Sequence, residues 1–147
     1  MKKNFQFESK KKTYETYSEQ ETFELSRTLG EYLKGDEVVL LTGELGAGKT
    51  VFTKGIAAGL GIEDVNQVCS PSFTLINIYR ARVPIIHIDL YRLNSEDEIA
   101  DLGWEDYLGQ AVIVVEWGEK MNYESSSIHV NLEVEHNLSR KITIEKK

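Results

Sequence analysis

The chain has 147 residues, of which 41% are hydrophobic and 28% are charged, and this is typical of one soluble globular domain with its own core. Its 17 basic and 24 acidic residues leave a net charge of −7, which argues against a protein that grips nucleic acid by itself. A single cysteine, Cys69, excludes an intramolecular disulfide and a cysteine-based zinc site, and it fits a reducing cytoplasm. The apolar runs, such as residues 38–41 and 112–115, are far shorter than the ~20 residues that cross a bilayer. We therefore expect a cytoplasmic protein without a signal peptide and without membrane or DNA contacts.

A short strand and an amphipathic helix are predicted near the amino end. Residues 1–12 are expected to form a loosely ordered extension or part of the first strand, and residues 13–17 alternate as a strand does. Ser18 and Glu21 have the spacing of a capping box, which marks the first turn of a helix. An apolar stripe with helical spacing follows, and it consists of Leu25, Leu29 and Leu33.

A glycine-rich loop then lies between a predicted buried strand and a predicted helix. Residues 38–41 are apolar and too few for a helix, so they favour a buried parallel strand. Residues 42–49 are rich in glycine, and residues 50–60 have helical character.

Five further segments have the composition of strands: residues 73–79, 83–89, 111–115, 128–134 and 141–144. The first two and the last two predict hairpins, because only a short turn separates the members of each pair. The continuous Val/Ile run of the third segment predicts a central strand. Between them, Ser95 and Glu98 repeat the capping-box spacing and predict a short helix.

The glycine-rich loop carries the chemistry. Its sequence, Gly43-Glu44-Leu45-Gly46-Ala47-Gly48-Lys49-Thr50, satisfies G-x-x-x-x-G-K-[ST] in full. The glycines let backbone amides approach phosphate oxygens, Lys49 supplies a charge for the β- and γ-phosphates, and Thr50 supplies a hydroxyl for Mg²⁺. We expect these eight residues and the neighbouring Val51 to bind a nucleoside triphosphate. The fold class predicted is α/β: a single P-loop NTPase domain whose mixed sheet has parallel core strands flanked by helices and an antiparallel carboxy-terminal hairpin.

A P-loop also needs a carboxylate for the metal ion, and two candidates end predicted strands. Asp89 is the commoner residue type at this position, whereas Glu116 follows the more apolar and therefore more central strand. Near one metal ion the two could divide the work, one holding Mg²⁺ and the other orienting water. The alternative for each is a helix cap or a surface carboxylate just past a strand. His87, two residues before Asp89, fits a core position or a bond to a phosphate-side carboxylate, and we interpret Cys69 as a small core residue.

Three other motifs follow the P-loop in order: Ser70-Pro71-Ser72-Phe73-Thr74-Leu75, His87-Ile88-Asp89-Leu90-Tyr91-Arg92-Leu93 and Val115-Glu116-Trp117. With the P-loop, they closely resemble the bacterial TsaE family, also called YjeE, from about residue 14 to about residue 144. The family's members are ATPases of threonylcarbamoyladenosine biosynthesis on tRNA. The resemblance implies ATP and Mg²⁺ as cofactors and slow hydrolysis without partners. It also implies work with the TsaB–TsaD pair, which modifies the adenosine beside the anticodon, so that tRNA is reached through that pair.

The resemblance also assigns roles to residues. It implies that Glu116 is the metal carboxylate, with Thr50, and that Asp89 is the essential aspartate, touching the metal directly or through water. It makes Lys49, Asp89 and Glu116 the catalytic set. A switch-like loop falls on Ser70, Pro71, Ser72, Phe73 and Thr74. Adenine contacts fall on Ser18, Thr22 and the carboxy-terminal hairpin, where Arg140 is the only arginine of the family's usual pair.

Two other functions stay open at this point. A small P-loop kinase would deliver the γ-phosphate to a metabolite, but the Arg-rich lid of such kinases is missing from the sequence. A non-catalytic ATP-binding adaptor would not need Lys49, Thr50, Asp89 and Glu116 together.

Overall fold

The structure, a computed structural model, describes residues 10–71 and 74–147. Within these residues the strands form one seven-stranded sheet in the order β1-β7-β6-β2-β5-β4-β3. Their bounds are β1 Lys11–Thr16, β2 Val38–Gly43, β3 Ile76–Arg80, β4 Pro84–Asp89, β5 Val112–Glu116, β6 Ile128–Val134 and β7 Arg140–Lys146. The helices are α1 Glu19–Tyr32, α2 Lys49–Gly59 and α3 Glu96–Ala100, with 3-10 turns at Val65–Gln67, Trp104–Tyr107 and Gly118–Lys120. The predicted α/β fold with a mixed sheet is confirmed.

The sheet combines a parallel centre with antiparallel additions at both edges. β2 pairs in parallel with β5 and with β6, and β4 pairs in parallel with β5. The hairpins β3–β4 and β6–β7 are antiparallel, and β1 adds to β7. The predicted strand at 141–144 extends to Arg140–Lys146, because β7 is hydrogen-bonded on both sides, to β6 and to β1.

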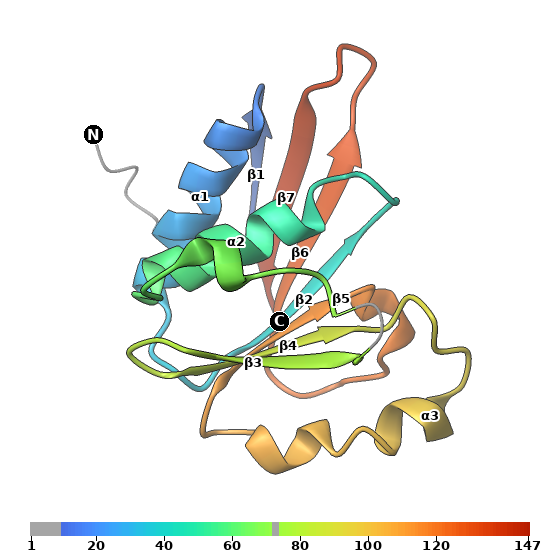
Figure 1. Ribbon diagram of the computed structural model, residues 1–147. Helices are drawn as coiled ribbons and strands as arrows, with labels where there is room; N and C mark the ends of the chain where they lie inside the picture. The colour runs from blue at the N-terminus through green and yellow to red at the C-terminus, as the bar shows by residue number, and fades with distance from the viewer. Residues whose placement is uncertain (1–9, 72–73) are drawn as a thin grey trace.

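Side-chain alternation along the central strands divides the core between the two faces of the sheet. Val39 and Leu41 of β2 belong to a cluster with the helices α1 and α2, whereas Val38 and Leu40 belong to a second cluster that includes Trp104. Figure 1 shows α1 and α2 over one face and α3 over the other. Both faces of the central strands are therefore covered, which explains their continuous apolar runs. None of the helices in the described residues is long and apolar enough to cross a membrane.

The helix α1 begins as its sequence predicts. Ser18 is its N-cap, and its hydroxyl oxygen accepts a hydrogen bond of 3.1 Å from the backbone amide of Glu21. The Glu21 carboxylate in turn accepts from the amide of Tyr17, one residue before the cap, so the capping box is shifted by one position.

Candidate functional site

The glycine-rich loop of residues 43–50, called the phosphate loop below, joins the end of β2 to the start of α2, as the sequence predicts. Gly43, Gly46 and Gly48 all have positive φ angles. At Gly43 the requirement for glycine is also steric, because a Cβ there would lie 2.5 Å from the carbonyl oxygen of Leu132. The loop ends at Gly48, the N-cap of α2, so the first amides of this helix and its positive dipole end face the loop.

Lys49 folds back over the loop instead of extending into solvent. Its ammonium donates hydrogen bonds to the carbonyl oxygens of Gly43, at 2.6 Å, and Glu44, at 2.9 Å. It also lies 4.1 Å from the centre of the Trp117 ring, a cation–π contact. Burial lowers the pKa of Lys49, and the negative charges of Glu116 and neighbouring acids only partly oppose this shift. The positive charge of Lys49 is therefore stabilised by two backbone carbonyls, by the face of the Trp117 ring and by the nearby carboxylates.

Among the described residues, four oxygen-bearing side chains converge beside the loop. β4 and β5 are parallel neighbours in which Asp89 pairs with Glu116, so the two carboxylates leave the sheet at the same edge. The Thr50 hydroxyl lies 3.3 Å and 3.5 Å from the two Glu116 oxygens. Ser70 donates a hydrogen bond of 2.6 Å to Asp89 Oδ2, and its hydroxyl lies 3.5 Å from Glu116 Oε2. Both carboxylates are nearly buried, with 6% of Asp89 and 3% of Glu116 exposed.

This donor set suits a hard cation. Mg²⁺ prefers oxygen ligands and is usually held by one or two carboxylates together with substrate phosphates. A pocket of about 420 Å³ lies over Lys49, Thr50, Ser70 and both carboxylates, with Trp117 in its wall. The residues present therefore fit a magnesium ion bound together with a phosphate chain. Trp117 is half-buried between Lys49 and Tyr91, whose ring centre is 5.2 Å away.

The structure combines the two interpretations of His87, a core position and a bond to a carboxylate of the site. The ring is fully buried, and its Nε2 lies 2.5 Å from Oε2 of Glu116. Its other nitrogen, Nδ1, lies 2.9 Å from the hydroxyl of Tyr79, a residue that sequence reasoning missed. The signal for Tyr79 is the hairpin register: His87 pairs with Asn77, so Tyr79 lies two residues along the neighbouring strand on the same face.

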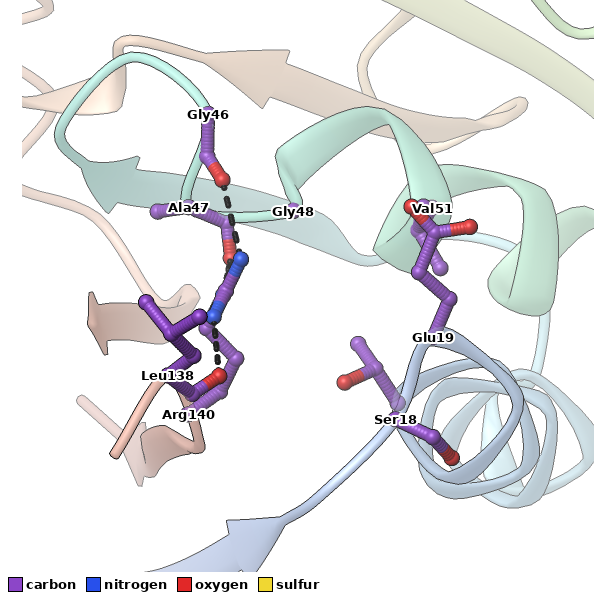
Figure 2. A pocket seen from close by; sticks show the side chains of 9 residues that line it. Ser18, Glu19, Gly46, Ala47, Gly48, Val51, Leu138 and Arg140 are labelled. Atoms are coloured by element: carbon purple, nitrogen blue, oxygen red, sulfur yellow. Dashed lines mark hydrogen bonds between the residues drawn. The ribbon is translucent and has the colours of Figure 1, made fainter. Parts of the chain in front are cut away.

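A second pocket, of about 260 Å³, adjoins the loop and shares Glu19, Gly46, Gly48 and Val51 with the first (Figure 2). It is lined by Ser18, Glu19, Thr22, Gly46, Ala47, Gly48, Val51, Leu138 and Arg140. Arg140 donates hydrogen bonds to the carbonyl oxygens of Ala47 at 3.1 Å, Gly46 at 3.3 Å and Leu138 at 2.6 Å. The pairing of Thr16 with Arg140 between β1 and β7 brings the amino-terminal and carboxy-terminal parts of this pocket together.

The expected switch-like segment is only partly in the site. Ser70 contacts the carboxylates, and Pro71 is buried beside it. Thr74 is exposed and bonds to Asn77, 3.1 Å away, rather than to either carboxylate. Ser72 and Phe73 lie outside the described residues.

One residue placement, that of Cys69, differs from the expectation. Cys69 is exposed, so its interpretation as a core residue was wrong. Its backbone bonds to the Tyr79 hydroxyl, and its sulfur accepts from the Asn77 amide at 3.9 Å. Glu44 and Leu45, at the tip of the phosphate loop, are exposed, and 75% of the Leu45 surface is accessible.

Comparison with known proteins gives a consistent result. The family model for TsaE, described as "Threonylcarbamoyl adenosine biosynthesis protein TsaE", matches residues 16–142. The TsaE proteins of Treponema pallidum and Aquifex aeolicus are 38% and 37% identical over 130 and 131 residues. These alignments cover 86% and 88% of this chain and 95% and 92% of the relatives. Both relatives are named "tRNA threonylcarbamoyladenosine biosynthesis protein TsaE".

A solved structure supports the same assignment. The crystal structure of YdiB from Bacillus subtilis superimposes with a TM-score of 0.75 at 29% identity, covering 93% of this chain and 86% of that one. With the family match over most of the chain, these likenesses establish that the chain belongs to the TsaE family of threonylcarbamoyl adenosine biosynthesis proteins.

Proposed function

We propose that the protein binds Mg·ATP at the phosphate loop and hydrolyses it slowly, in support of threonylcarbamoyl transfer to the adenosine beside the tRNA anticodon. The observation that carries the proposal is the convergence of Thr50, Ser70, Asp89 and Glu116 at the end of a glycine loop that already holds Lys49. Membership of the TsaE family supports the role in tRNA modification.

The phosphate-binding groups are backbone amides and one ammonium. The amides of residues 46–50 and the Lys49 ammonium would hold the phosphates, while Thr50 and Glu116 would hold Mg²⁺. When bound, the metal ion neutralises charge on the phosphate oxygens. Lys49 would exchange its carbonyl partners for phosphate oxygens, which a flexible point charge does readily.

Asp89 is proposed to orient the attacking water. Its Oδ2 accepts from Ser70 and its Oδ1 accepts from the amide of Tyr91 at 2.9 Å, so the carboxylate plane is fixed by two donors. A fixed acceptor beside the metal site can align a water molecule, directly or within the metal shell, without reorganising during the reaction.

The pocket of Figure 2 is proposed to take the adenine ring, between Ser18 and Thr22 on one side and Arg140 on the other. It adjoins the phosphate loop through Gly46, Ala47 and Gly48, as a base attached to loop-bound phosphates requires.

The proposed partner is the TsaB–TsaD pair, with tRNA reached through that pair in the cytoplasm. The net charge of −7 supports this division of labour, since an acidic protein gains little from phosphate contacts with tRNA.

The test is ATP hydrolysis by the protein alone and with the TsaB–TsaD pair. We expect slow turnover alone and clear stimulation by the pair, with activity lost in Lys49→Ala. Glu116→Gln keeps an oxygen for His87 but removes the charge, and we expect hydrolysis to fall roughly 10²–10³-fold. Glu124→Gln, an exposed acid on the loop before β6, is the matched control and should leave the rate unchanged. Fast hydrolysis unaffected by the pair would contradict the proposal and favour a metabolite kinase.

A further inference from the structure

A hydrogen-bonded chain of buried side chains runs from the end of β5 to the backbone before β3. Glu116 Oε2 lies 2.5 Å from His87 Nε2, and His87 Nδ1 lies 2.9 Å from the Tyr79 hydroxyl. The Tyr79 hydroxyl in turn lies 3.0 Å from the carbonyl oxygen of Cys69 and accepts from the Cys69 amide at 3.3 Å. His87 is fully buried and Tyr79 is 6% exposed, so water does not compete for these bonds.

One arrangement of protons satisfies every polar atom of this chain. In this arrangement His87 donates from Nε2 to Glu116 Oε2 and accepts at Nδ1 from the Tyr79 hydroxyl. Burial raises the pKa of Tyr79, so its hydroxyl keeps the proton that it donates. The Cys69 carbonyl is still satisfied, because the Asn77 amide donates to it at 3.2 Å. The carbonyl therefore stands as a second acceptor within reach of the Tyr79 proton.

The chain holds the Glu116 carboxylate in one orientation. His87 engages Oε2, which also lies 3.5 Å from the Thr50 and Ser70 hydroxyls, and Oε1 lies 3.3 Å from Thr50 with no bond to His87. Carboxylates that hold metal ions depend on such outer hydrogen bonds for their orientation. The imidazole depends on Tyr79 in the same way, since the hydroxyl sets which ring nitrogen carries the hydrogen.

The segment at Cys69 and Ser70 is thereby tied to both carboxylates. Ser70 bonds to Asp89 through its own hydroxyl, and the neighbouring Cys69 backbone connects to Glu116 through Tyr79 and His87. Movement of either carboxylate must therefore alter at least one contact that holds this segment.

We propose that Tyr79 and His87 are positioning residues that set the orientation of Glu116 for Mg²⁺ and couple that orientation to the backbone at Cys69. The proposal rests on the proposed function, because it concerns the metal site assigned there. It predicts that binding of Mg²⁺ with nucleotide changes the environment of Cys69, and that this change passes through the Tyr79 hydroxyl.

The test removes that hydroxyl alone, with Tyr79→Phe. The matched control is Tyr123→Phe, since Tyr123 packs its ring edge-on to Trp104 in the other core cluster. The first measurement is the affinity for a fluorescent non-hydrolysable ATP analogue, titrated with Mg²⁺ and in EDTA. We expect Tyr79→Phe to need about tenfold more Mg²⁺ for half-maximal binding, with the affinity in EDTA unchanged. A purely structural role would weaken binding equally in both conditions.

The second measurement uses Cys69 as a built-in reporter. It is the only cysteine of the chain and its side chain is exposed, so a thiol reagent such as dithiobis-nitrobenzoate reads out this one position. In the parent protein and in Tyr123→Phe, we expect Mg²⁺ with the analogue to change the labelling rate at least twofold relative to the analogue in EDTA. In Tyr79→Phe the two rates should converge.

The outcomes separate the two proposals. If the parent protein shows no Mg²⁺-dependent binding of the analogue, the proposed function fails and the coupling fails with it. If the parent protein behaves as expected and Tyr79→Phe matches it in both measurements, the coupling alone is wrong. A thermal melt checks that Tyr79→Phe is folded. If it is not, His87→Asn replaces it, because the shorter amide cannot span both contacts, and the same two measurements decide.

Discussion

Burying two carboxylates side by side is costly for an acidic protein, and the site keeps them. Asp89 and Glu116 are register partners on adjacent strands, and each is almost inaccessible to water. Ser70, His87 and the Lys49 charge offset part of the repulsion, but an apolar pair would pack there at lower cost. Two buried carboxylates that lower the stability of the fold are typical of a functional site.

Arg140 supports the phosphate loop from outside it. Its guanidinium donates to the carbonyl oxygens of Gly46, Ala47 and Leu138, which a single ammonium group cannot reach together. We therefore expect Arg140→Lys to keep the charge but loosen the loop, and to raise the Kd for an ATP analogue about tenfold, or about 1.4 kcal/mol. Fluorescence titration measures this. The control is Lys141→Ala at the exposed neighbouring position, and this variant should bind the analogue as the parent protein does. An unchanged Kd in Arg140→Lys would show that the loop keeps its shape without the guanidinium group.

The sequence predicted the residues of this site better than their connections. The glycine loop, Asp89 and Glu116 are visible because each belongs to a short pattern, a motif or the end of an apolar run. Tyr79 belongs to no such pattern, and only the register of the β3–β4 hairpin places its hydroxyl next to His87. Cys69 was misjudged because residue type alone favours burial of a cysteine.

At the scale of elements, the contact between α1 and α2 depends on glycine. A Cβ built on Gly30 would lie 2.3 Å from the carbonyl oxygen of Ile56, and one on Gly59 would lie 2.2 Å from that of Arg27. Gly59, the last residue of α2, is therefore a point of close approach between the two helices. The helices and the apolar stripe of α1 were predictable from residue spacing. The short distance between α1 and α2 was not, because it depends on which residues face each other across the contact.

Gly55 gives the clearest test of this packing. Its Cβ would meet Ser26 Oγ at 1.6 Å and the carbonyl oxygen of Phe23 at 2.6 Å. At an exposed helix position glycine to alanine stabilises by about 1 kcal/mol, but here we expect Gly55→Ala to destabilise by about 1–3 kcal/mol in urea denaturation. Adding Ser26→Gly should recover part of the loss. Lys54→Ala, the neighbouring change in the same helix, should stay within about 0.5 kcal/mol, and a stabilised Gly55→Ala would contradict the close contact.

At the scale of the whole molecule, the sheet order assembles the site. The carboxyl ends of β2, β4 and β5 bring together the loop and both carboxylates, which parallel central strands make predictable. The addition of β1 to β7 was not predictable, because edge pairing depends on contacts between the two ends of the chain. That pairing nevertheless places Ser18 and Arg140 around one pocket.

Glu37 connects the end of α1 to the sheet through hydrogen bonds, and its contribution to stability depends on pH. Its carboxylate accepts from the backbone amides of Lys34, at 2.8 Å, and Gly35, at 2.9 Å, just after α1. Its own carbonyl accepts from the amide of Ile113 at 3.0 Å, beside the start of the β2–β5 ladder. Burial alone would raise the pKa of Glu37, but the backbone amides outweigh it, so the pKa lies below its ordinary value of 4.5.

The sign of the pH dependence follows from this lowered pKa. A carboxyl that is more acidic in the folded chain contributes its full stabilisation above 4.5 and loses it as the pH falls through the folded value. We expect Glu37→Gln to cost about 1 kcal/mol of unfolding free energy at neutral pH, since the amide nitrogen replaces one acceptor with a donor. The cost should shrink below about pH 4, because the parent carboxyl then protonates and loses the same bonds. Urea denaturation of both proteins across this range measures it, with the exposed Glu63→Gln as control. A difference between parent and Glu37→Gln that stays constant down to about pH 3 would mean that the ionised carboxylate does not hold the end of α1 to the sheet.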